Sequence, residues 1–598
     1  MSAARAARPV RSGGLVHGVL GGTLLVGTAL LAACVRPSRF DEGGPWPPPR
    51  AGMVVSEHPL ATAVGAAILE RGGNAADAAV ATALALAVVL PQAGNLGGGG
   101  FAVWVAHEPE EAPRFLDFRE TAPAALRTEH FVGPEGRFVP ARALETGLAV
   151  GVPGSPRGLF ELQRTLGRLA FAEVVAPAIA LARDGFPVDE DLARDLAEEA
   201  PKLARHPGAR ELYFPGGLPL AAGTRFAQPD LARTLARYAA EGPDAFYLGE
   251  VAEKLVVEVQ AAEGVLTLAD LAGYEAKWRP PLRGWFRGHE IVTAPPPSSG
   301  GVALLQVLAL LDGFPLDEER MRARAEDPSD PVGLSQRALH WWVECMRLAF
   351  ADRAEHLGDP DFQRVPVERL LSPERINTLR VGIGELANPR VRSAALAARE
   401  GSQTTHLSVL DPEGNAVALT TTLNTSFGAG IVARGTGVLL NDEIDDFAIV
   451  AGVPNAYGLV GGAANALAPR KRPLSSMTPT VVRDGGQVVK LVLGSPGGPR
   501  IITSVLGVLL RTIAYGQDLE AAVAAPRIHQ QWVPDVTRVE RGWDEALLQR
   551  LRDKQHRLEV QDERWGSVQA IAVEVGGEPV GVSDPRSGGS AQRAVKRR

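Results

Sequence analysis

The chain has 598 residues, of which 45% are hydrophobic and 22% are charged, so it can bury a large core. Its formal net charge is -7, and no stripe of Lys and Arg with interleaved aromatic residues occurs, which argues against nucleic acid as a partner. The sequence also lacks the Cys and His spacings of zinc sites, phosphate-binding loops and dinucleotide fingerprints. We therefore expect a globular protein that works without a metal or cofactor.

The first 33 residues have the composition of an export signal rather than of a folded segment. Three arginines precede a stretch, residues 12–33, that contains no acidic residue, lysine or arginine. This stretch ends in Leu31-Ala32-Ala33-Cys34, which resembles the cleavage and lipidation box of bacterial lipoproteins. The sequence thus predicts removal of residues 1–33 as a signal peptide and lipidation of Cys34. The alternative is an ordinary secretory signal with an incidental cysteine.

The residues after Cys34 indicate where the protein acts. Residues 34–50 are rich in proline and glycine, which is typical of a spacer between an anchor and a folded body. Val35 takes the place of the aspartate that often signals retention at the inner membrane, so an outer membrane is favoured. We expect an exported protein, periplasmic or extracellular, that is lipid-anchored to a bacterial outer membrane. Besides Cys34 only Cys345 remains, so no intrachain disulfide is expected.

From residue 51 onwards strand and helix patterns are mixed, which fits an α/β (or α+β) class. Cys345 falls in a helix-like stretch and is expected to be a small core hydrophobe. In chain order, we expect helices at 60–70 and 75–90, the second capped by Asn74; strands at 101–106 and ending at 117–118; helices between 155 and about 263; a strand at 289–294; a helix at 301–311; an exposed loop at 321–333; a helix at 334–356; strands at 405–410 and 416–423; and helices at 501–514 and 519–523.

The strands at 405–410 and 416–423 are separated by a turn sequence, Asp411-Pro412-Glu413-Gly414-Asn415. A hairpin centred on Glu413 pairs residues whose numbers sum to 826, which places Thr404 opposite Thr422. Threonine is common in strands, so this pair alone is best interpreted as ordinary strand residues.

Polar and glycine-rich loops follow the hairpin. Asn424 closes its second strand, and glycines 97–100, earlier in the chain, lack dinucleotide-site spacing and are interpreted as close backbone packing. The later segments are the acidic Asn441-Asp442-Glu443-Ile444-Asp445-Asp446, the serine pair in Pro473-Leu474-Ser475-Ser476, and the loop Gly494-Ser495-Pro496-Gly497-Gly498-Pro499.

Taken in this order, these segments resemble the γ-glutamyltransferases (glutathione hydrolases) of the N-terminal nucleophile hydrolase superfamily. The resemblance extends over roughly residues 51 to 590 and implies a four-layer αββα sandwich. It also includes the segments Met53-Val54-Val55-Ser56-Glu57-His58-Pro59-Leu60-Ala61, Gly97-Gly98-Gly99-Gly100-Phe101, Asp117-Phe118-Arg119-Glu120, Pro297-Ser298-Ser299-Gly300-Gly301 and Arg347-Leu348-Ala349-Phe350-Ala351-Asp352-Arg353.

The resemblance implies that the chain cleaves itself between Gln403 and Thr404. A large subunit, residues 51–403 behind the spacer, and a small subunit, residues 404–598, would then stay together as a heterodimer in one composite catalytic domain. A threonine hydroxyl needs a nearby base to attack an amide. The freed α-amine of Thr404 supplies one, since its pKa is about 7.7–8.0, and such help is worth roughly 10²–10⁴ in rate.

In this family the nucleophile attacks the γ-carbonyl of a γ-glutamyl compound, such as glutathione, to form an acyl-enzyme. Water then completes hydrolysis, or an amino-acid or dipeptide acceptor completes transfer. By resemblance, Thr404 is the nucleophile and Thr422 orients its amine or hydroxyl. Gly497 and Gly498 would offer backbone N–H groups to the oxyanion, and each such donor is worth about 10²–10³ in kcat.

The glutamyl head carries a carboxylate and an ammonium group, so its pocket must supply both signs of charge. By resemblance, the fork of Arg119 grips the α-carboxylate with help from the hydroxyls of Ser475 and Ser476. The α-ammonium would be held by the side chains of Asn424, Glu443 and Asp446.

The loop Pro454-Asn455-Ala456-Tyr457-Gly458-Leu459 resembles the lid of family members that cover this pocket, with Tyr457 shielding the acyl-enzyme from water. Two alternatives remain open. One is a β-lactam (glutaryl or cephalosporin) acylase of the same superfamily, which need not bind an α-ammonium group. The other is an uncleaved, lipid-anchored binding protein without catalysis.

Overall fold

Two antiparallel sheets lie face to face at the centre of the fold. The computed structural model describes residues 49–108, 110–327, 332–388, 404–485 and 488–595. The first sheet has seven strands, in the order β20-β1-β9-β10-β2-β3-β6. These are β1 (Gly52–Ser56), β2 (Gly99–Val105), β3 (Arg114–Phe118), β6 (Lys277–Arg279), β9 (Thr404–Leu410), β10 (Ala416–Thr422) and β20 (Ser590–Ala594).

The second sheet has six strands, in the order β19-β18-β14-β13-β8-β7. These are β7 (Leu282–Phe286), β8 (His289–Thr293), β13 (Thr480–Arg483), β14 (Val489–Gly494), β18 (Gln569–Val573) and β19 (Pro579–Ser583). The remaining strands form small sheets away from this centre: β4 (Phe186–Pro187) with β5 (Arg225–Phe226), β11 (Val432–Ala433) with β12 (Val438–Leu439), and β15 (Ile528–His529) with β16 (Thr537–Glu540) and β17 (Leu558–Gln561).

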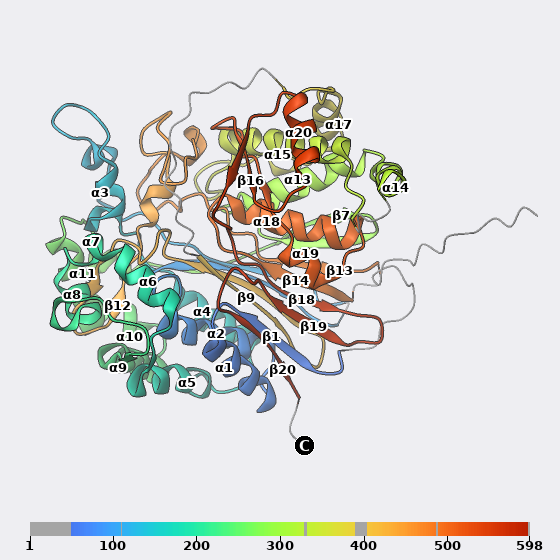
Figure 1. Ribbon diagram of the computed structural model, residues 1–598. Coiled ribbons are helices and arrows are strands. Elements are labelled where there is room, and N and C mark those ends of the chain that lie inside the picture. Colours follow the sequence, from blue (N-terminus) through green and yellow to red (C-terminus); the bar gives the residue numbers. More distant parts are fainter. Residues whose placement is uncertain (1–48, 109, 328–331, 389–403, 486–487, 596–598) are drawn as a thin grey trace, which may run out of the picture. The chain divides into compact units, whose positions relative to one another are not determined.

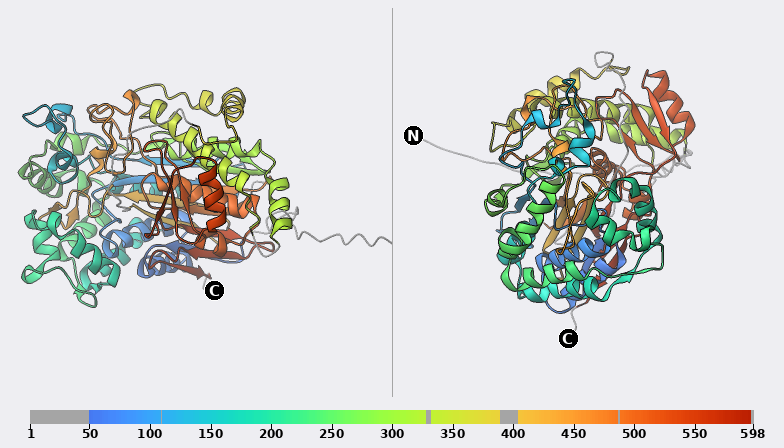
Figure 2. Two further views of the ribbon diagram at one scale, coloured as in Figure 1. Left: turned by 45° about the horizontal axis from the view of Figure 1, so that its top comes forward. Right: turned by 90° about the vertical axis from the view of Figure 1, so that its left-hand side faces the viewer.

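Alternating strand residues give each large sheet two apolar faces. Val54 of β1 packs into a core shared with the helices on one side, whereas Val55 packs between the two sheets. In the second sheet, Leu491 of β14 packs with the helices on the other side, and Val492 faces the first sheet. Helices therefore cover both outer faces (Figure 1; Figure 2). The four-layer αββα sandwich implied by the resemblance is confirmed.

The helices of the first layer follow the first sheet closely in sequence. Asn74 caps the second of them through the N–H groups of Ala76 and Asp77, as predicted. The helices that lie between β1 and β6 in the sequence are α1 (Pro59–Glu70), α2 (Ala75–Val89), α3 (Pro140–Leu144), α4 (Ser155–Leu166), α5 (Phe171–Asp184), α6 (Glu190–Glu198), α7 (Ala200–Leu203), α8 (Pro207–Tyr213), α9 (Pro229–Glu241), α10 (Asp244–Tyr247), α11 (Gly249–Ala261) and α12 (Leu268–Ala272).

The helices of the other layer include α15, in which Cys345 is fully buried, as expected for a core residue. Among the described residues no single helix is long and apolar enough to cross a membrane, although the bent pair α13 and α14 meets that test jointly. These later helices are α13 (Gly300–Asp312), α14 (Leu316–Glu326), α15 (Gln336–His356), α16 (Val367–Leu370), α17 (Pro373–Val381), α18 (Arg500–Leu509), α19 (Leu519–Ala524) and α20 (Glu545–Asp553).

One prediction about this second layer was wrong, and one of its helices was missed. The expected loop at 321–333 is helical as far as Glu326, because α14 consists of strong helix formers with acidic residues in its first turn and Arg324 in its last. Helix α20 was not predicted. Its N-cap is Asp544, whose side chain accepts a hydrogen bond from Leu547 N.

Candidate active site

The hairpin of β9 and β10 forms with the predicted register. Thr404, the first residue of β9, pairs with Thr422, the last residue of β10. Their hydroxyl oxygens are 3.1 Å apart, and Thr404 is only 5% exposed. His406 and Ser408 lie on the same face of β9 and contact the second sheet, at Gly494 and at the carbonyl of Gln569. Thr404 therefore faces the second sheet at the end of the sandwich.

The hydroxyl of Thr422 accepts a hydrogen bond from the backbone two residues further along the chain. Asn424 N donates to Thr422 Oγ1 over 2.8 Å. Asn424 has a φ of +77°, a conformation that asparagine tolerates better than most residues. Its Nδ2 group donates to the carbonyl of Asp442 over 3.0 Å, which anchors the acidic loop to the end of β10. The hydroxyl of Thr422 thus contacts the backbone N–H of Asn424 and the hydroxyl of Thr404.

The glycine pair lies where β14 ends and α18 begins. Gly497 and Gly498 have φ values of +128° and +53°, which would strain any other residue. Their carbonyls accept hydrogen bonds from the N–H groups of Arg500 and Ile501, so the pair leads directly into the helix. The N-terminus of a helix favours negative charge, as an oxyanion requires.

Tyr457 joins the glycine pair to the hairpin. Its hydroxyl donates to the carbonyl of Asn424 over 2.5 Å, and its ring lies so close to Gly498 that a Cβ there would be 2.8 Å from the ring. Gln531 Nε2 donates to the carbonyl of Tyr457 over 3.3 Å. Burial raises the pKa of Tyr457 well above its usual value, so the hydroxyl stays protonated and remains a donor.

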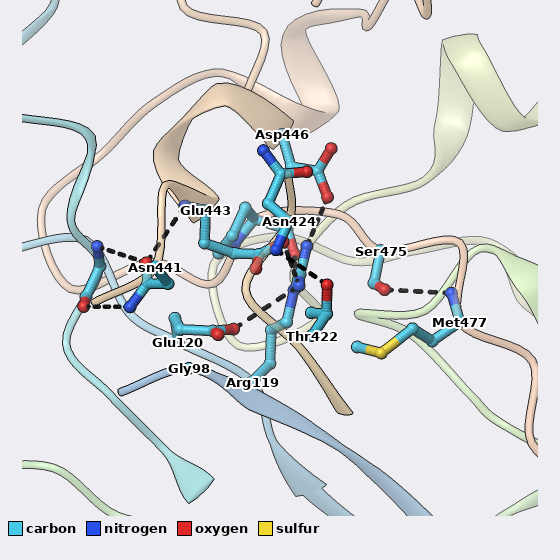
Figure 3. A network of polar contacts seen from close by, with 12 residues as sticks. Gly98, Arg119, Glu120, Thr422, Asn424, Asn441, Glu443, Asp446, Ser475 and Met477 are labelled. Atoms are coloured by element: carbon cyan, nitrogen blue, oxygen red, sulfur yellow. Dashed lines mark hydrogen bonds and ion pairs between the residues drawn. The ribbon is translucent and has the colours of Figure 1, made fainter. Parts of the chain in front are cut away.

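Arg119 lies fully buried at the centre of a charged network (Figure 3). Its two terminal nitrogens contact Glu443 Oε1 at 2.5 Å and Asp446 Oδ2 at 2.6 Å, and its Nε donates to the carbonyl of Pro473 over 3.2 Å. Glu120 Oε2 is 3.5 Å from the same guanidinium. The residues expected to bind the α-carboxylate and the α-ammonium are thus in direct contact with each other.

The carboxylates of this network are not fully balanced by the guanidinium of Arg119. Burial raises the pKa of Glu120 to about 7 and that of Glu443 well above its usual value, although Arg119 counteracts both effects. Glu443 Oε2 is buried without a hydrogen-bond donor among the described residues. The network therefore has more carboxylate than its single guanidinium satisfies, so an incoming ammonium group would find an unpaired acceptor.

Ser475, the first residue of the serine pair, lies to the right of Arg119 in Figure 3, whereas Glu443 lies to its left. Ser475 Oγ accepts a hydrogen bond from Met477 N over 3.1 Å. Ser476 Oγ is 3.4 Å from a terminal nitrogen of Arg353, whose Nε donates to Ser299 Oγ over 2.9 Å. Burial lowers the pKa of Arg353 to about 10, so it is still a cation near neutral pH.

Sequence reasoning missed three residues of this site. Glu120 directly follows Arg119 and was quoted without a role. Asn441 accepts hydrogen bonds from Gly151 N and Glu443 N, and so fixes the start of the acidic loop. Arg353 is the third. Adjacency to predicted site residues could have indicated the first two, but nothing local to Arg353 shows that α15 directs it towards Ser476.

Thr404 opens onto a pocket of ≈ 580 Å³, which Tyr457, Gly497 and Gln531 also line. Arg119, Glu443 and Asp446 are not among the residues that line this pocket. Two further predictions, lipidation of Cys34 and cleavage after Gln403, fall outside the described residues.

A family model described as gamma-glutamyltranspeptidase matches residues 61–594, which is most of the chain. The chain belongs to the gamma-glutamyltranspeptidase family. One relative in this family, the glutathione hydrolase proenzyme of Escherichia coli (strain K12), is 43% identical over 575 residues, which cover 94% of this chain and 96% of the relative.

Solved structures agree with the gamma-glutamyltranspeptidase assignment. A cephalosporin acylase from Bacillus halodurans matches with a TM-score of 0.79 and 27% identity, over 94% of this chain and 100% of the other. The gamma-glutamyltranspeptidase of Helicobacter pylori matches with a TM-score of 0.52 and 37% identity, over 56% of this chain and 92% of the other. The protein is therefore an enzyme with the N-terminal nucleophile hydrolase fold.

Proposed function

We propose that this gamma-glutamyltranspeptidase hydrolyses glutathione and other γ-glutamyl compounds, and transfers the γ-glutamyl group to amino acids or dipeptides, with Thr404 as the nucleophile. The observation that supports the proposal is the pairing of Thr404, which lines the pocket, with Thr422, while Asn424 ties the end of β10 to the acidic loop that contacts Arg119. Neither feature alone identifies the reaction. Together they support a threonine nucleophile that acts on a substrate carrying groups of both charges.

Cleavage between Gln403 and Thr404 would give Thr404 a free α-amine. That amine takes the proton of the Thr404 hydroxyl as it attacks the γ-carbonyl, and returns it to the leaving amine. Thr422, 3.1 Å away, holds the hydroxyl in place. The carbonyl oxygen becomes negative as the bond forms, and the N–H groups of Gly497 and Gly498 at the start of α18 stabilise that charge.

Binding of the glutamyl head is an exchange of ion pairs. The substrate carboxylate takes the fork of Arg119, assisted by the hydroxyls of Ser475 and Ser476. The substrate ammonium takes the carboxylates of Glu443 and Asp446, which Arg119 otherwise contacts. A ligand without the ammonium would leave these carboxylates unmatched, so the pocket discriminates against it.

Export also belongs to this proposal. The signal-like residues 1–33 and the lipidation box at Cys34 support a lipid-anchored enzyme at a bacterial outer membrane, facing the periplasm or the exterior. Such a location would give the enzyme access to γ-glutamyl compounds outside the cytoplasm.

A denaturing gel of the purified protein tests the nucleophile directly. We expect two bands, and N-terminal sequencing of the smaller should begin Thr-Thr-His. Thr404→Ala should give a single band and no turnover, whereas Thr405→Ala, the adjacent control, should still be cleaved. A fully active, uncleaved chain would refute the proposal.

A pair of substrates distinguishes the acylase alternative from the proposed γ-glutamyl activity. The acidic network around Arg119 favours a ligand with an α-ammonium group, so a γ-glutamyl anilide should be hydrolysed much faster than the glutaryl anilide that lacks only that group. A preference for the glutaryl compound would make the enzyme an acylase. The family assignment already argues against a non-catalytic binding protein.

A further inference from the structure

One side of the pocket in front of Thr404 is strongly acidic. Helix α6 and its flanking residues contribute five carboxylates to the lining, and the only basic side chain from this segment in the lining is Arg194. Arg194 already contacts two of the five, at 2.7 Å and 3.4 Å. We call this segment the α6 wall. Its acidic residues are Asp189, Asp191, Asp195, Glu198 and Glu199.

Asp195 is the member of the α6 wall that lies deepest. Its side chain is 13% exposed, and burial together with the charges of Glu198 and Asp191 raises its pKa to about 6, although Arg194 counteracts this. It is therefore ionised above neutral pH while still shielded from much of the solvent. A cation that reached it would gain more than at a fully exposed carboxylate.

Two buried oxygen atoms beside the α6 wall lack donors. Gln92 donates its Nε2 to Asp195 over 3.2 Å, but its Oε1 finds no hydrogen-bond donor among the described residues. The Oγ of Ser426 likewise has no partner there. Both residues line the pocket and are 4% and 6% exposed. Phe427 N donates to the carbonyl of Gln92, which holds the two loops together.

Buried acceptors without donors are rare in folded proteins and call for an explanation. Here Gln92 and Ser426, each with one such oxygen, line the same pocket as Asp195. The ligand chemistry that matches this set is a cation with several N–H donors, namely an ammonium or guanidinium group. Acidity and unmatched acceptors are independent observations that indicate the same class of ligand.

We propose that the α6 wall is the acceptor subsite for cationic amino acids and peptides, and that it binds their basic side chain while their α-amine attacks the acyl group on Thr404. This rests on the proposed function. The same pocket is also lined by Arg500 and Arg564, which come from other segments and supply positive charge for the acceptor's carboxylate. An acidic acceptor would meet the α6 wall with like charge.

The transfer step balances without a further reactant. The acceptor's neutral α-amine attacks the acyl carbon, the bond to Thr404 Oγ1 breaks, and the proton lost by the amine returns to that oxygen through the α-amine of Thr404. The product is a γ-glutamyl amide of the basic acceptor.

Arginine and citrulline form a matched pair of acceptors, since they differ in charge but little in size. With a γ-glutamyl anilide as donor, the half-saturating acceptor concentration should be about threefold to tenfold lower for arginine, as expected for one partly shielded ion pair. Asp195→Asn should reduce this ratio towards one. Because both acceptors are measured on one preparation, differences in donor chemistry cancel.

Glu198→Gln provides a second variant, since Glu198 is exposed and its replacement should not affect folding. It should also reduce the ratio, by less than Asp195→Asn. Glu253→Gln, an exposed site on α11, removes the same charge outside the pocket and should keep the wild-type ratio. Equal use of arginine and citrulline by the wild-type enzyme, or an unchanged ratio in both wall variants, would overturn the inference. Failure to hydrolyse the donor at all would instead overturn the proposed function.

Discussion

At the scale of single residues, the site depends on two hydroxyl groups 3.1 Å apart. Thr422 differs from an ordinary strand threonine because its oxygen accepts a hydrogen bond from Asn424 N and faces a second hydroxyl at the same time. The register of the hairpin is what brings Thr404 to this point. The spacing of turn and strand residues is therefore sufficient to predict the register that pairs Thr404 with Thr422.

Replacement of Thr422 tests its role in holding the nucleophile. Thr422→Val keeps the shape but removes the hydroxyl, so kcat should fall by about 10²-fold, the lower end of what proton-transfer groups contribute. Thr422→Ser restores the oxygen and should recover most of the rate. Steady-state kinetics on a γ-glutamyl anilide would measure both, and equal rates for Val and wild type would show that the hydroxyl has no such role.

The proposed substrate-binding residue Arg119 should also contribute to stability. Arg119→Met would leave Glu443, Glu120 and Asp446 buried without their cation, and loss of one partner from a buried ion pair typically costs about 3–5 kcal/mol. We expect a clearly lower thermal midpoint together with loss of saturation by γ-glutamyl substrates. Arg119→Lys should keep much of the stability but raise KM, because a point charge cannot form the two-pronged contact. An unchanged KM in the lysine variant would contradict this assignment.

At the scale of elements, neighbouring segments of the first sheet approach each other so closely that particular positions must be glycine. A Cβ on Gly98, the residue before β2, would lie 2.1 Å from the carbonyl oxygen of Thr422. The glycine run at 97–100 was predicted to allow close backbone packing, and this is confirmed. The contact also connects β2 directly to the site, since it touches the backbone of a proposed catalytic residue.

Gly98→Ala should therefore lower both stability and activity, because β2 and the end of β10 must move apart. Gly507→Ala is the matched control. It lies in α18 with nothing within 4 Å of the added methyl group, and the change should stabilise the helix by about 0.5–1 kcal/mol. Thermal unfolding and kcat of the two variants would show opposite trends in stability. A neutral Gly98→Ala would mean that the strands can separate without consequence.

His406 on β9 predicts an acid dependence of stability. It is buried between the sheets, hydrogen-bonded to the hydroxyls of Thr420 and Ser408, and burial lowers its pKa to about 3. In the unfolded chain a histidine has a pKa of about 6.5, so between pH 6.5 and 3 the unfolded state binds a proton that the native state does not. The free energy of unfolding should therefore decrease as pH falls through this range, by about 1.4 kcal/mol per pH unit.

The same shift, to a pKa of about 3, applies to His529 and His556, so wild-type stability should fall steeply in acid. His406→Asn should make the decline between pH 6.5 and 4.5 shallower, whatever its effect at neutral pH. Thermal midpoints at several pH values would measure the slopes. An identical slope in variant and wild type would show that His406 titrates normally.

At the scale of the whole molecule, strands on either side of the proposed cleavage point alternate within one sheet. The order β20-β1-β9-β10-β2 places two strands from after residue 403 between two from before it. The second sheet is mixed in the same way, since β13 pairs with β8. Separation of the two subunits would break backbone hydrogen bonds in both sheets.

We therefore predict that the cleaved enzyme migrates as one species in gel filtration under native conditions, although it gives two bands when denatured. In a urea titration, dissociation of the subunits should coincide with loss of the native circular dichroism signal, because neither can leave without unfolding. Release of a folded subunit before the unfolding transition would contradict this account.

Sequence patterns predicted the features that are set by neighbouring residues, and missed the contacts between residues that are far apart in the sequence. The hairpin register, the cap at Asn74 and the buried Cys345 follow from local spacing or composition. Helix α14 was missed because its apolar residues do not form a stripe, although its composition and terminal charges favour a helix. The contact between Arg119 and Glu443 joins residues 324 positions apart, and the direction of Arg353 depends on how α15 docks.

The interleaving of strands has a consequence for the lifetime of the cleaved enzyme. Once unfolded, two separate polypeptides would have to meet and rebuild shared sheets, a concentration-dependent reaction that competes with aggregation. The lifetime of the cleaved enzyme would then be set by the rate at which the assembly unfolds, rather than by the equilibrium between folded and unfolded forms. Precursor cleavage would thus make unfolding effectively irreversible, so that the enzyme's stability would be kinetic rather than thermodynamic.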